Sequence, residues 1–275
     1  MASSAALRWC DMLPPVGFTG QIGRPNSRKT LWSPSLISTS LWLDSLDAST
    51  LTVSGANVSQ WSDKSGNARH VSQGTSTQQP LYDGSPGLIF DGSNDFLQST
   101  ASITSGTYSG AFTLIYAATR TKADGGCILT ERTTALAGSF FWTGTSPYYI
   151  SSDGTNAASN TTISQSDFNA LSTSGGIVVH QHLSGARDTL LLNGSEVTVT
   201  AGTGSNITGA NGFRVGRREG TNTNYWGGRI YEIIAVAETL SASTRETLEG
   251  YLAHKYNLAA GLPAQHPYKT SPPYI

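Results

Sequence analysis

Short apolar segments separated by turn residues recur along most of the 275-residue chain, and this pattern constrains its fold more than any other feature. Examples are the segments 57–61, 111–119, 177–183 and 228–237, which alternate apolar and polar residues or are rich in β-branched and aromatic residues. Gly, Asn, Asp and Ser lie between such segments, and these residues favour tight turns. Short strands at such intervals predict an all-β sandwich or barrel.

The low charge of the chain argues against two kinds of partner. Charged residues make up 13% of the sequence, below the ~25% of typical soluble domains, and the net charge is −1. Without clustered Lys and Arg, we expect no nucleic-acid partner. No segment approaches the ~20 apolar residues that span a bilayer, and Arg8 and Asp11 interrupt the apolar run that a signal peptide needs, so we expect no membrane association. Cys10 and Cys127 are expected to be unpaired thiols.

Residues 1–39 differ in composition from the rest of the chain. They hold four prolines and show no apolar period, which predicts an irregular N-terminal arm ahead of a domain at 40–275. That domain is expected to close with a helix at about 242–256, capped by Ser241, and a Pro-rich extended tail. We expect the arm to attach the domain to another protein. Its candidate contact residues are Arg8, Trp9, Phe18 and Trp32.

Distinctive motifs lie near the two ends of the domain. The first set is LWLD at 41–44, WSDKSGN at 61–67 and GLIFDG at 87–92; the second is EIIAVA at 232–237, EGYLAHKY at 249–256, LPA at 262–264 and HPYK at 266–269. These motifs resemble the opening and the close of the laminin G-like jelly-roll branch of the concanavalin A-like lectin/glucanase superfamily. The resemblance covers about residues 41–269 and implies a jelly-roll β-sandwich, in a family of folds more than of functions.

The resemblance implies a structural role, because such modules are common in bacteriophage structural proteins and bacterial surface proteins. We therefore expect a non-enzymatic virion protein: a capsid decoration or cement protein, a head fibre, or a tail or baseplate component. Its expected partners are other virion proteins, such as a capsid or tail protein, or further copies of itself in a homo-oligomer.

The alternative is an adhesin or receptor module that binds cell-surface glycans. Sugar sites often pair an aromatic platform with polar acceptors, although aromatic clusters also anchor cores. The candidate aromatic residues are Trp142, Tyr148, Tyr149, Tyr225 and Trp226.

A glycoside hydrolase is the disfavoured alternative. Laminarinase-type members of the superfamily share a strand motif of closely spaced acids, and retaining hydrolysis needs two carboxyls ~5–5.5 Å apart. The best match here is Glu232 with Glu238, which a strand would separate by roughly 20 Å. The chain has no G-x-S-x-G nucleophile motif, and His180 and His182 share a strand face without a third metal ligand at suitable spacing. We therefore expect no enzymatic activity.

Calcium is the one cofactor that the sequence leaves open. Asp63 with Asn67, and Asp91 with Asp95, place oxygen ligands in turns, as calcium sites in laminin G-like folds do. The same residue types stabilise turns without a metal, because their side chains bond the nearby backbone.

Overall fold

The computed structural model describes most of the chain from residue 29 onward. The described residues are 29–101, 103, 111–122, 126–131, 138–142, 148–151, 160–163, 174–183, 186–199, 212–218 and 224–275. The chain divides into two compact units, residues 1–30 and 31–275. Almost all of the first unit lies outside the described residues, so the following account concerns the second.

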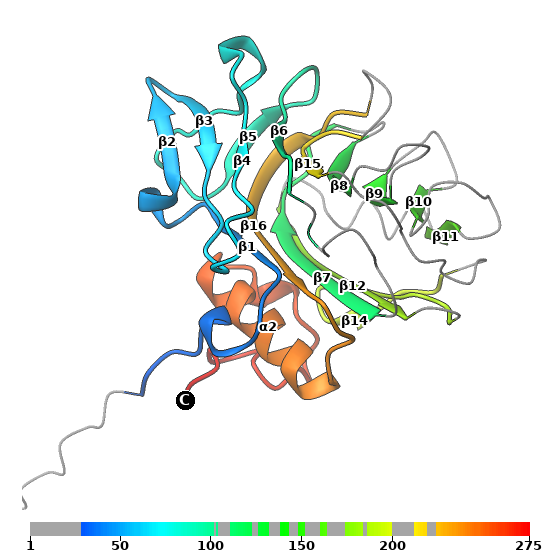
Figure 1. The fold of residues 1–275 in the computed structure, drawn as a ribbon. Coiled ribbons are helices and arrows are strands. Elements are labelled where there is room, and N and C mark those ends of the chain that lie inside the picture. Colours follow the sequence, from blue (N-terminus) through cyan, green and yellow to red (C-terminus); the bar gives the residue numbers. More distant parts are fainter. Residues whose placement is uncertain are drawn as a thin grey trace, which may run out of the picture. The chain divides into compact units, whose positions relative to one another are not determined.

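One antiparallel sheet forms the centre of this unit (Figure 1). Among the described residues it has seven strands in the order β1–β16–β7–β12–β13–β14, and β5 pairs with the free part of β16. These strands are β1 (Leu41–Asp44), β5 (Leu88–Asp91), β7 (Ala111–Ala118), β12 (Gly176–Leu183), β13 (Thr189–Leu192), β14 (Ser195–Glu196) and β16 (Gly227–Val236).

A second antiparallel sheet packs on one face of the first. In the described part of the chain it has nine strands, ordered β11–β10–β9–β8–β15–β6–β4–β3–β2. These strands are β2 (Leu51–Ser54), β3 (Asn57–Trp61), β4 (Val71–Ser72), β6 (Leu97–Ser99), β8 (Cys127–Glu131), β9 (Gly138–Trp142), β10 (Tyr148–Ser151), β11 (Asn160–Ile163) and β15 (Phe213–Val215). Short 3-10 helices lie before β1, between β1 and β2, between β4 and β5, and after helix α2: η1 (Pro34–Leu36), η2 (Ala48–Thr50), η3 (Ser76–Gln78) and η4 (Ala259–Gly261).

The central strands of the seven-stranded sheet are buried on both faces. In β7, Leu114 and Tyr116 point into the core between the two sheets, whereas Ile115 and Ala117 join a second core on the opposite face. A strand covered on both sides has no polar face, which explains why β7 is apolar along almost its whole length; the buried Thr113 is an exception, and its hydroxyl donates to the carbonyl oxygen of Glu238.

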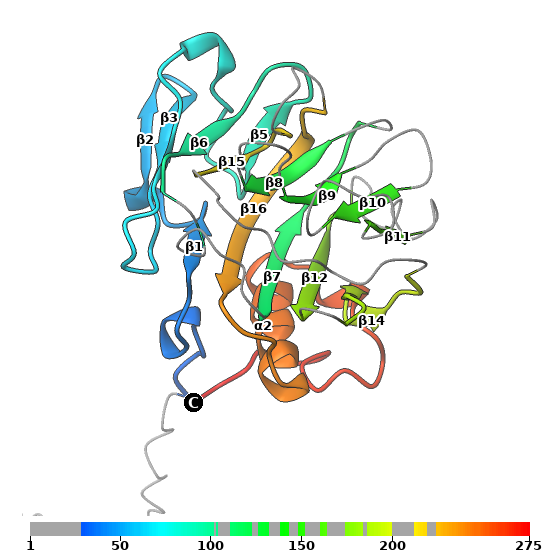
Figure 2. The same cartoon turned by 45° about the vertical axis from the view of Figure 1, so that its right-hand side comes forward.

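Helix α2 (Ala242–Lys255) covers that opposite face (Figure 2). Ser241 caps its first turn by accepting a hydrogen bond from the backbone N–H of Thr244, as the sequence predicts. Leu248 and Leu252 are fully buried beneath the helix, against the sheet.

A bulge in β16 changes which side chains face the helix. Ile230 and Ile233 both face the core between the sheets, although an odd spacing normally puts two strand residues on opposite faces. The register with β7 shifts between Ile230 and Glu232, so one extra residue is accommodated there. Tyr231 and Glu232 can therefore both contact Tyr256, which follows helix α2.

The predicted fold class is confirmed: an all-β jelly-roll sandwich with a single C-terminal α-helix among the described residues. Within these residues, no helix has the length and apolar character needed to cross a membrane. Of the predicted arm, Arg8, Trp9 and Phe18 lie outside the described residues. Trp32 belongs to the second unit, where its ring meets Tyr251 of α2 edge-on at a centroid distance of 5.9 Å.

Candidate functional site

An open pocket of about 480 Å³ lies beside β13 and β14. A two-residue turn builds it: Asn193 and Gly194 both have positive φ, of 49° and 78°. Such turns suit the twist of antiparallel strands and return the chain directly beside itself. The pocket is lined by Arg187, Asp188, Thr189, Glu196, Val197, Thr198 and Val199.

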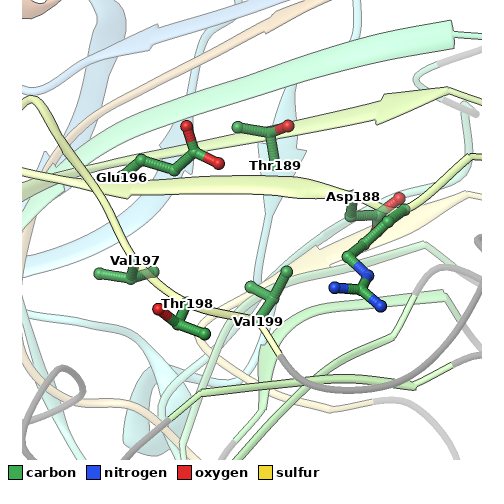
Figure 3. Close-up of a pocket in the computed structure, with 7 residues that line it drawn as sticks. Asp188, Thr189, Glu196, Val197, Thr198 and Val199 are labelled. Carbon is green, nitrogen blue, oxygen red and sulfur yellow. The ribbon is translucent and has the colours of Figure 1, made fainter.

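The lining combines polar and apolar groups. Figure 3 shows Thr189 and Glu196 on neighbouring strands, with Val197, Thr198 and Val199 along the segment that follows β14. The Glu196 side chain is exposed and can accept hydrogen bonds, and the Thr198 hydroxyl can donate or accept them. Such a surface suits a small ligand with several hydroxyl groups and some apolar C–H surface.

Two buried histidines, His180 and His182, bond to Asp188 in the wall of the pocket. Asp188 Oδ2 lies 2.7 Å from His180 Nε2, and Asp188 Oδ1 lies 2.7 Å from His182 Nδ1. Phe112 packs against both imidazoles. Burial alone would raise the pKa of Asp188, but the two imidazoles hold that pKa well below its ordinary value.

The two histidines thus share one strand face, as predicted, but their common partner is a carboxylate. Nowhere in the described structure do three or more His, Cys, Asp or Glu side chains form a group suited to a metal ion. Asp188 therefore fixes the orientation of the histidines and the position of Arg187 and Thr189 in the pocket wall.

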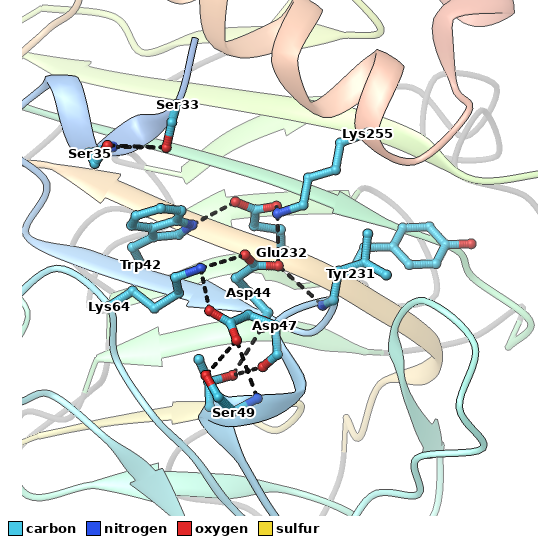
Figure 4. Close-up of polar contacts among 12 residues, drawn as sticks. Ser33, Ser35, Trp42, Asp44, Asp47, Ser49, Lys64, Tyr231, Glu232 and Lys255 are labelled. Atoms are coloured by element: carbon cyan, nitrogen blue, oxygen red, sulfur yellow. Dashed lines mark hydrogen bonds and ion pairs between the residues drawn. The ribbon is translucent and has the colours of Figure 1, made fainter. Parts of the chain in front are cut away.

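A second polar cluster joins helix α2 to the seven-stranded sheet (Figure 4). We call it the helix–sheet cluster; it consists of Trp42, Asp44, Lys64, Glu232, Tyr251, Lys255 and Tyr256. Lys255 Nζ lies 2.6 Å from Glu232 Oε2 and 2.8 Å from Asp44 Oδ1. Lys64 Nζ lies 2.9 Å from Asp44 Oδ2.

In both carboxyls of this cluster, burial raises the pKa and the neighbouring lysines lower it. Burial raises the pKa of Glu232, although Lys255 opposes the shift. Burial would also raise the pKa of Asp44, but Lys255 and Lys64 together bring it below its ordinary value.

Glu232 and Glu238, the two carboxyls considered for glycoside hydrolysis, lie in different environments. Trp42 Nε1, at 2.6 Å, and the hydroxyl groups of Tyr251 and Tyr256 donate hydrogen bonds to the fully buried Glu232. Glu238 is exposed beyond the far end of β16.

The predicted glycan-binding aromatic residues have different environments. Trp226 is fully buried in the core between the sheets, and Tyr225 is only 6% exposed, with the Arg217 guanidinium 5.2 Å from its ring centroid. Neither ring offers an open stacking surface. The pairing of β9 with β10 places Trp142 opposite Tyr149, but the side chains of these residues and of Tyr148 lie outside the described part of the structure.

The first predicted calcium turn is filled by hydrogen bonds. The Asp63 carboxylate accepts from the backbone N–H groups of Trp42, Ser65 and Arg69, and from the Ser65 hydroxyl at 2.7 Å. Asn67 Nδ2 donates to the carbonyl oxygen of Thr39 at 3.0 Å. The Asp63 and Asn67 side chains therefore already hold the loop against the start of β1 by hydrogen bonds alone.

The second predicted calcium turn also bonds mainly to itself. Asp91 Oδ1 accepts from the backbone N–H groups of Ser93, Asn94 and Asp95, and Asp95 Oδ2 accepts from the backbone N–H of Asp91. Lys122 Nζ lies 2.9 Å from the carbonyl oxygen of Gly92, which puts a competing cation on the same turn. Burial, with a smaller effect of Asp91, raises the pKa of Asp95 to about 6. Calcium binding therefore stays a prediction without support from this geometry.

The pocket residues were not predicted as a site from the sequence. The Asn193–Gly194 turn pairs β13 with β14, which brings residues 187–189 and 196–199 to one pocket. The signal in the sequence is the Asn–Gly pair, which favours a tight turn between two strands. β14 ends at Glu196, and the backbone N–H of Val197 donates one more hydrogen bond to the carbonyl oxygen of Leu190.

Comparison with known proteins gives the fold alone. No family model matches the chain, and no curated protein matches it. The receptor-binding domain of botulinum neurotoxin D is similar, with a TM-score of 0.53, 10% identity and coverage of 77% of this chain and 52% of the toxin chain.

Two further solved structures show the same likeness. A structure of botulinum neurotoxin type C, described by its dependence on two ganglioside molecules for cell entry, gives a TM-score of 0.52 at 14% identity, covering 78% of this chain and 51% of that one. Trypanosoma rangeli sialidase in complex with sialic acid gives 0.51 at 14% identity, covering 78% and 33%. The chain thus spans about half of the toxin chains and a third of the sialidase, and it shares a β-sandwich fold with them.

Proposed function

We propose that this chain is a non-enzymatic glycan-binding module and that the pocket beside β13 and β14 is its ligand site. The observation that carries the proposal is the lining of this pocket, in which Arg187, Glu196 and Thr198 surround a volume of about 480 Å³. Pockets of this size typically hold one or a few sugar-sized groups.

The chemistry of the lining suits a sugar ring. A carboxylate such as Glu196 accepts hydrogen bonds from hydroxyl groups, and the Arg187 guanidinium donates them in a fixed fork. The methyl groups of Val197 and Val199 offer apolar contact to the C–H face of a ring. The binding wall is also preorganised, because Asp188 is fixed by two buried imidazoles, and preorganisation reduces the cost of binding.

The similar solved structures support the proposal. The description of botulinum neurotoxin type C names an interaction with gangliosides, and the sialidase was solved with sialic acid. A shared sandwich makes sugar recognition a reasonable use of this scaffold, while the pocket residues supply the specific argument.

The absence of catalysis is part of the proposal. Glu232 is enclosed by the helix–sheet cluster, and Asp188 is held by His180 and His182. Asp188 lines the pocket together with Glu196, but both of its oxygen atoms bond to the buried imidazoles, which supports a binding role over glycoside hydrolysis with two free carboxyls.

The test is a binding titration of the full chain against a panel of soluble oligosaccharides. The oligosaccharide that binds most tightly is then titrated against variants of the pocket residues. We expect R187Q and E196Q each to weaken binding at least about tenfold, because each replaces a charged hydrogen-bonding partner of the ligand by a neutral amide. E238Q is the matched control, since Glu238 is exposed outside the pocket, and it should bind like the parent. Absence of sugar binding, or equal binding by all variants, overturns the proposal. Release of reducing sugar would overturn its non-enzymatic part.

The virion role stays a prediction from the sequence resemblance. Copurification of the chain with phage particles through a density gradient would test it, and a virion component with a sugar-binding pocket would satisfy both predictions.

A further inference from the structure

The C-terminal residues 263–275, which we call the strap, lie along the outer side of helix α2. His254 Nε2 donates a hydrogen bond to the carbonyl oxygen of Tyr268 at 2.8 Å, and the Thr247 and Tyr268 hydroxyl groups are 3.2 Å apart. Gly250 leaves room for the strap, because a methyl group at this position would overlap Tyr268.

The end of the strap fastens the segment through which the chain enters the domain. The backbone N–H of Trp32 donates to the carbonyl oxygen of Pro273 at 3.0 Å, and Leu31 forms an antiparallel bridge with Tyr274. Opening of the strap would therefore also release Leu31 and Trp32 from the tail.

One buried pair of titratable groups joins the strap to the helix. His266 Nε2 lies 3.1 Å from Glu249 Oε2; Glu249 is fully buried, and His266 is 8% exposed. The backbone N–H of Tyr268 donates to His266 Nδ1 at 3.2 Å. Since Nδ1 accepts a hydrogen bond, the ring proton is at Nε2 and is donated to Glu249.

This geometry resists a charge on either side chain. Protonation of His266 would place a second hydrogen at Nδ1, facing the N–H of Tyr268, so that two donors would oppose each other. A negative charge on Glu249 would be fully buried, and Oε1 has no hydrogen-bond partner to stabilise it, with Arg245 Nε 3.8 Å away. The closed strap therefore favours the neutral forms of both His266 and Glu249.

The pKa shifts of Glu249 and His266 also favour the neutral forms, because burial outweighs the effects of the neighbouring charges. Arg245 and Glu246 of helix α2 and Lys269 of the strap are the charged neighbours of this pair in the described structure. Burial lowers the pKa of His266, opposed by Glu246 and assisted by Arg245 and Lys269. Burial raises the pKa of Glu249 to about 7, although Arg245 opposes the shift.

We propose that Glu249 and His266 form a pH-compensated latch, which keeps the strap and the entry segment closed with little dependence on pH because the two side chains respond to protons in opposite directions. At a pH below the ordinary pKa of histidine, His266 is protonated when the strap is open, and closing the strap releases that proton. Closing it takes up a proton at Glu249 when the pH lies between the ordinary pKa of a glutamate and about 7, so the two effects oppose each other where the two ranges overlap.

Loss of either side chain turns the latch into a switch, with opposite signs. In E249Q only His266 remains, so the closed strap is stable at neutral pH and opens as pH falls. In H266N the amide oxygen still accepts from Tyr268 and cannot titrate, so Glu249 alone makes the closed strap less stable as pH rises. Each uncompensated group changes the opening equilibrium by up to about tenfold per pH unit within its range.

The test is hydrogen–deuterium exchange of the full chain at pH 5, 6 and 7, corrected for the intrinsic pH dependence of exchange. We expect the protection of peptides covering 263–275 and 31–37 to vary less than about threefold in the parent, to fall with acid in E249Q, and to fall with rising pH in H266N. H254Q is the matched control. His254 also contacts Tyr268, but as a donor to a carbonyl oxygen, so in this variant the protection of the strap should depend on pH as weakly as in the parent.

Two results would overturn the proposal: a parent strap that opens about tenfold per pH unit, or two variants with flat profiles. If a variant does not fold, ring nitrogen-15 NMR of the parent decides. We expect His266 at pH 7 to be protonated at Nε2 and unprotonated at Nδ1, and the opposite tautomer would refute the latch.

Discussion

Lys255 Nζ lies 2.6 Å from Glu232 Oε2, so the last turn of helix α2 supplies the cation for a carboxylate that is fully buried in β16. The hydroxyl groups of Tyr251 and Tyr256 donate to the same carboxylate. Helix and sheet are thus joined by charge as well as by the apolar contacts of Leu248 and Leu252.

Removal of this cation should destabilise the domain strongly. In K255M the buried Glu232 would lose its charged partner, and we expect a loss of about 3 kcal/mol in the free energy of unfolding. Because burial raises the pKa of Glu232, the loss should be larger at pH 8 than at pH 5, where protonation becomes easier. Chemical denaturation of K255M and of K255M/E232Q checks this; the double variant should recover much of the loss, and equal losses would contradict the explanation.

The Asp188 carboxylate should matter for stability more than a surface carboxylate does. D188A leaves His180 and His182 buried without their shared acceptor, and we expect it to cost about 2–4 kcal/mol. D83A is the control: Asp83 also forms an ion pair, with Arg229, but at the surface, so its loss should cost less than about 1 kcal/mol. Comparable losses in the two variants would show that the buried bonds contribute little.

Calcium should leave the stability of the domain unchanged. Asp63 and Asp91 already accept hydrogen bonds from their own turns, so we expect the same melting temperature in excess calcium and in chelator. D63A should lower stability by about 2 kcal/mol under both conditions, because it removes the side-chain acceptor of the backbone N–H groups of Trp42 and Ser65. A calcium-dependent rise in the melting temperature that D63A or D91A abolishes would restore the metal site.

The turn at Asp95 should make the protein less stable as pH rises. A carboxyl whose pKa is raised on folding, here to about 6, favours the folded state below its ordinary pKa and loses that advantage as pH increases through the raised value. D95N keeps an oxygen that can accept from Asp91, and we expect it to be more stable than the parent by about 1–2 kcal/mol at pH 7. The difference should disappear near pH 4. Unfolding curves at both pH values check this, with E238Q as an exposed control.

The sequence predicted elements whose signals are local. Helix α2 follows Ser241 as expected, because a cap and an apolar face are both readable from neighbouring residues. The strand at 177–183 is likewise close to the observed β12 (Gly176–Leu183). These segments are long, and their patterns agree with their final burial.

The features that sequence reasoning missed depend on residues far apart in the chain. In the sequence, Glu232 stands out only as a possible partner of Glu238, yet it is buried near the bulge and bonded to Trp42, which is 190 positions away. Trp226 lies between Gly-rich and Asn-rich segments, which suggest exposure, but it is fully buried between the sheets. Local pattern cannot reveal either outcome, because each is decided by the strand that packs alongside.

The bridge between Leu31 and Tyr274 has a practical consequence for engineering, since it brings the two ends of the 31–275 unit side by side (Figure 1). Neighbouring termini permit circular permutation, in which a short linker joins the ends and new ones are opened at an exposed turn. The same geometry would allow this unit to be inserted into a surface loop of another protein without forcing the two sides of that loop apart.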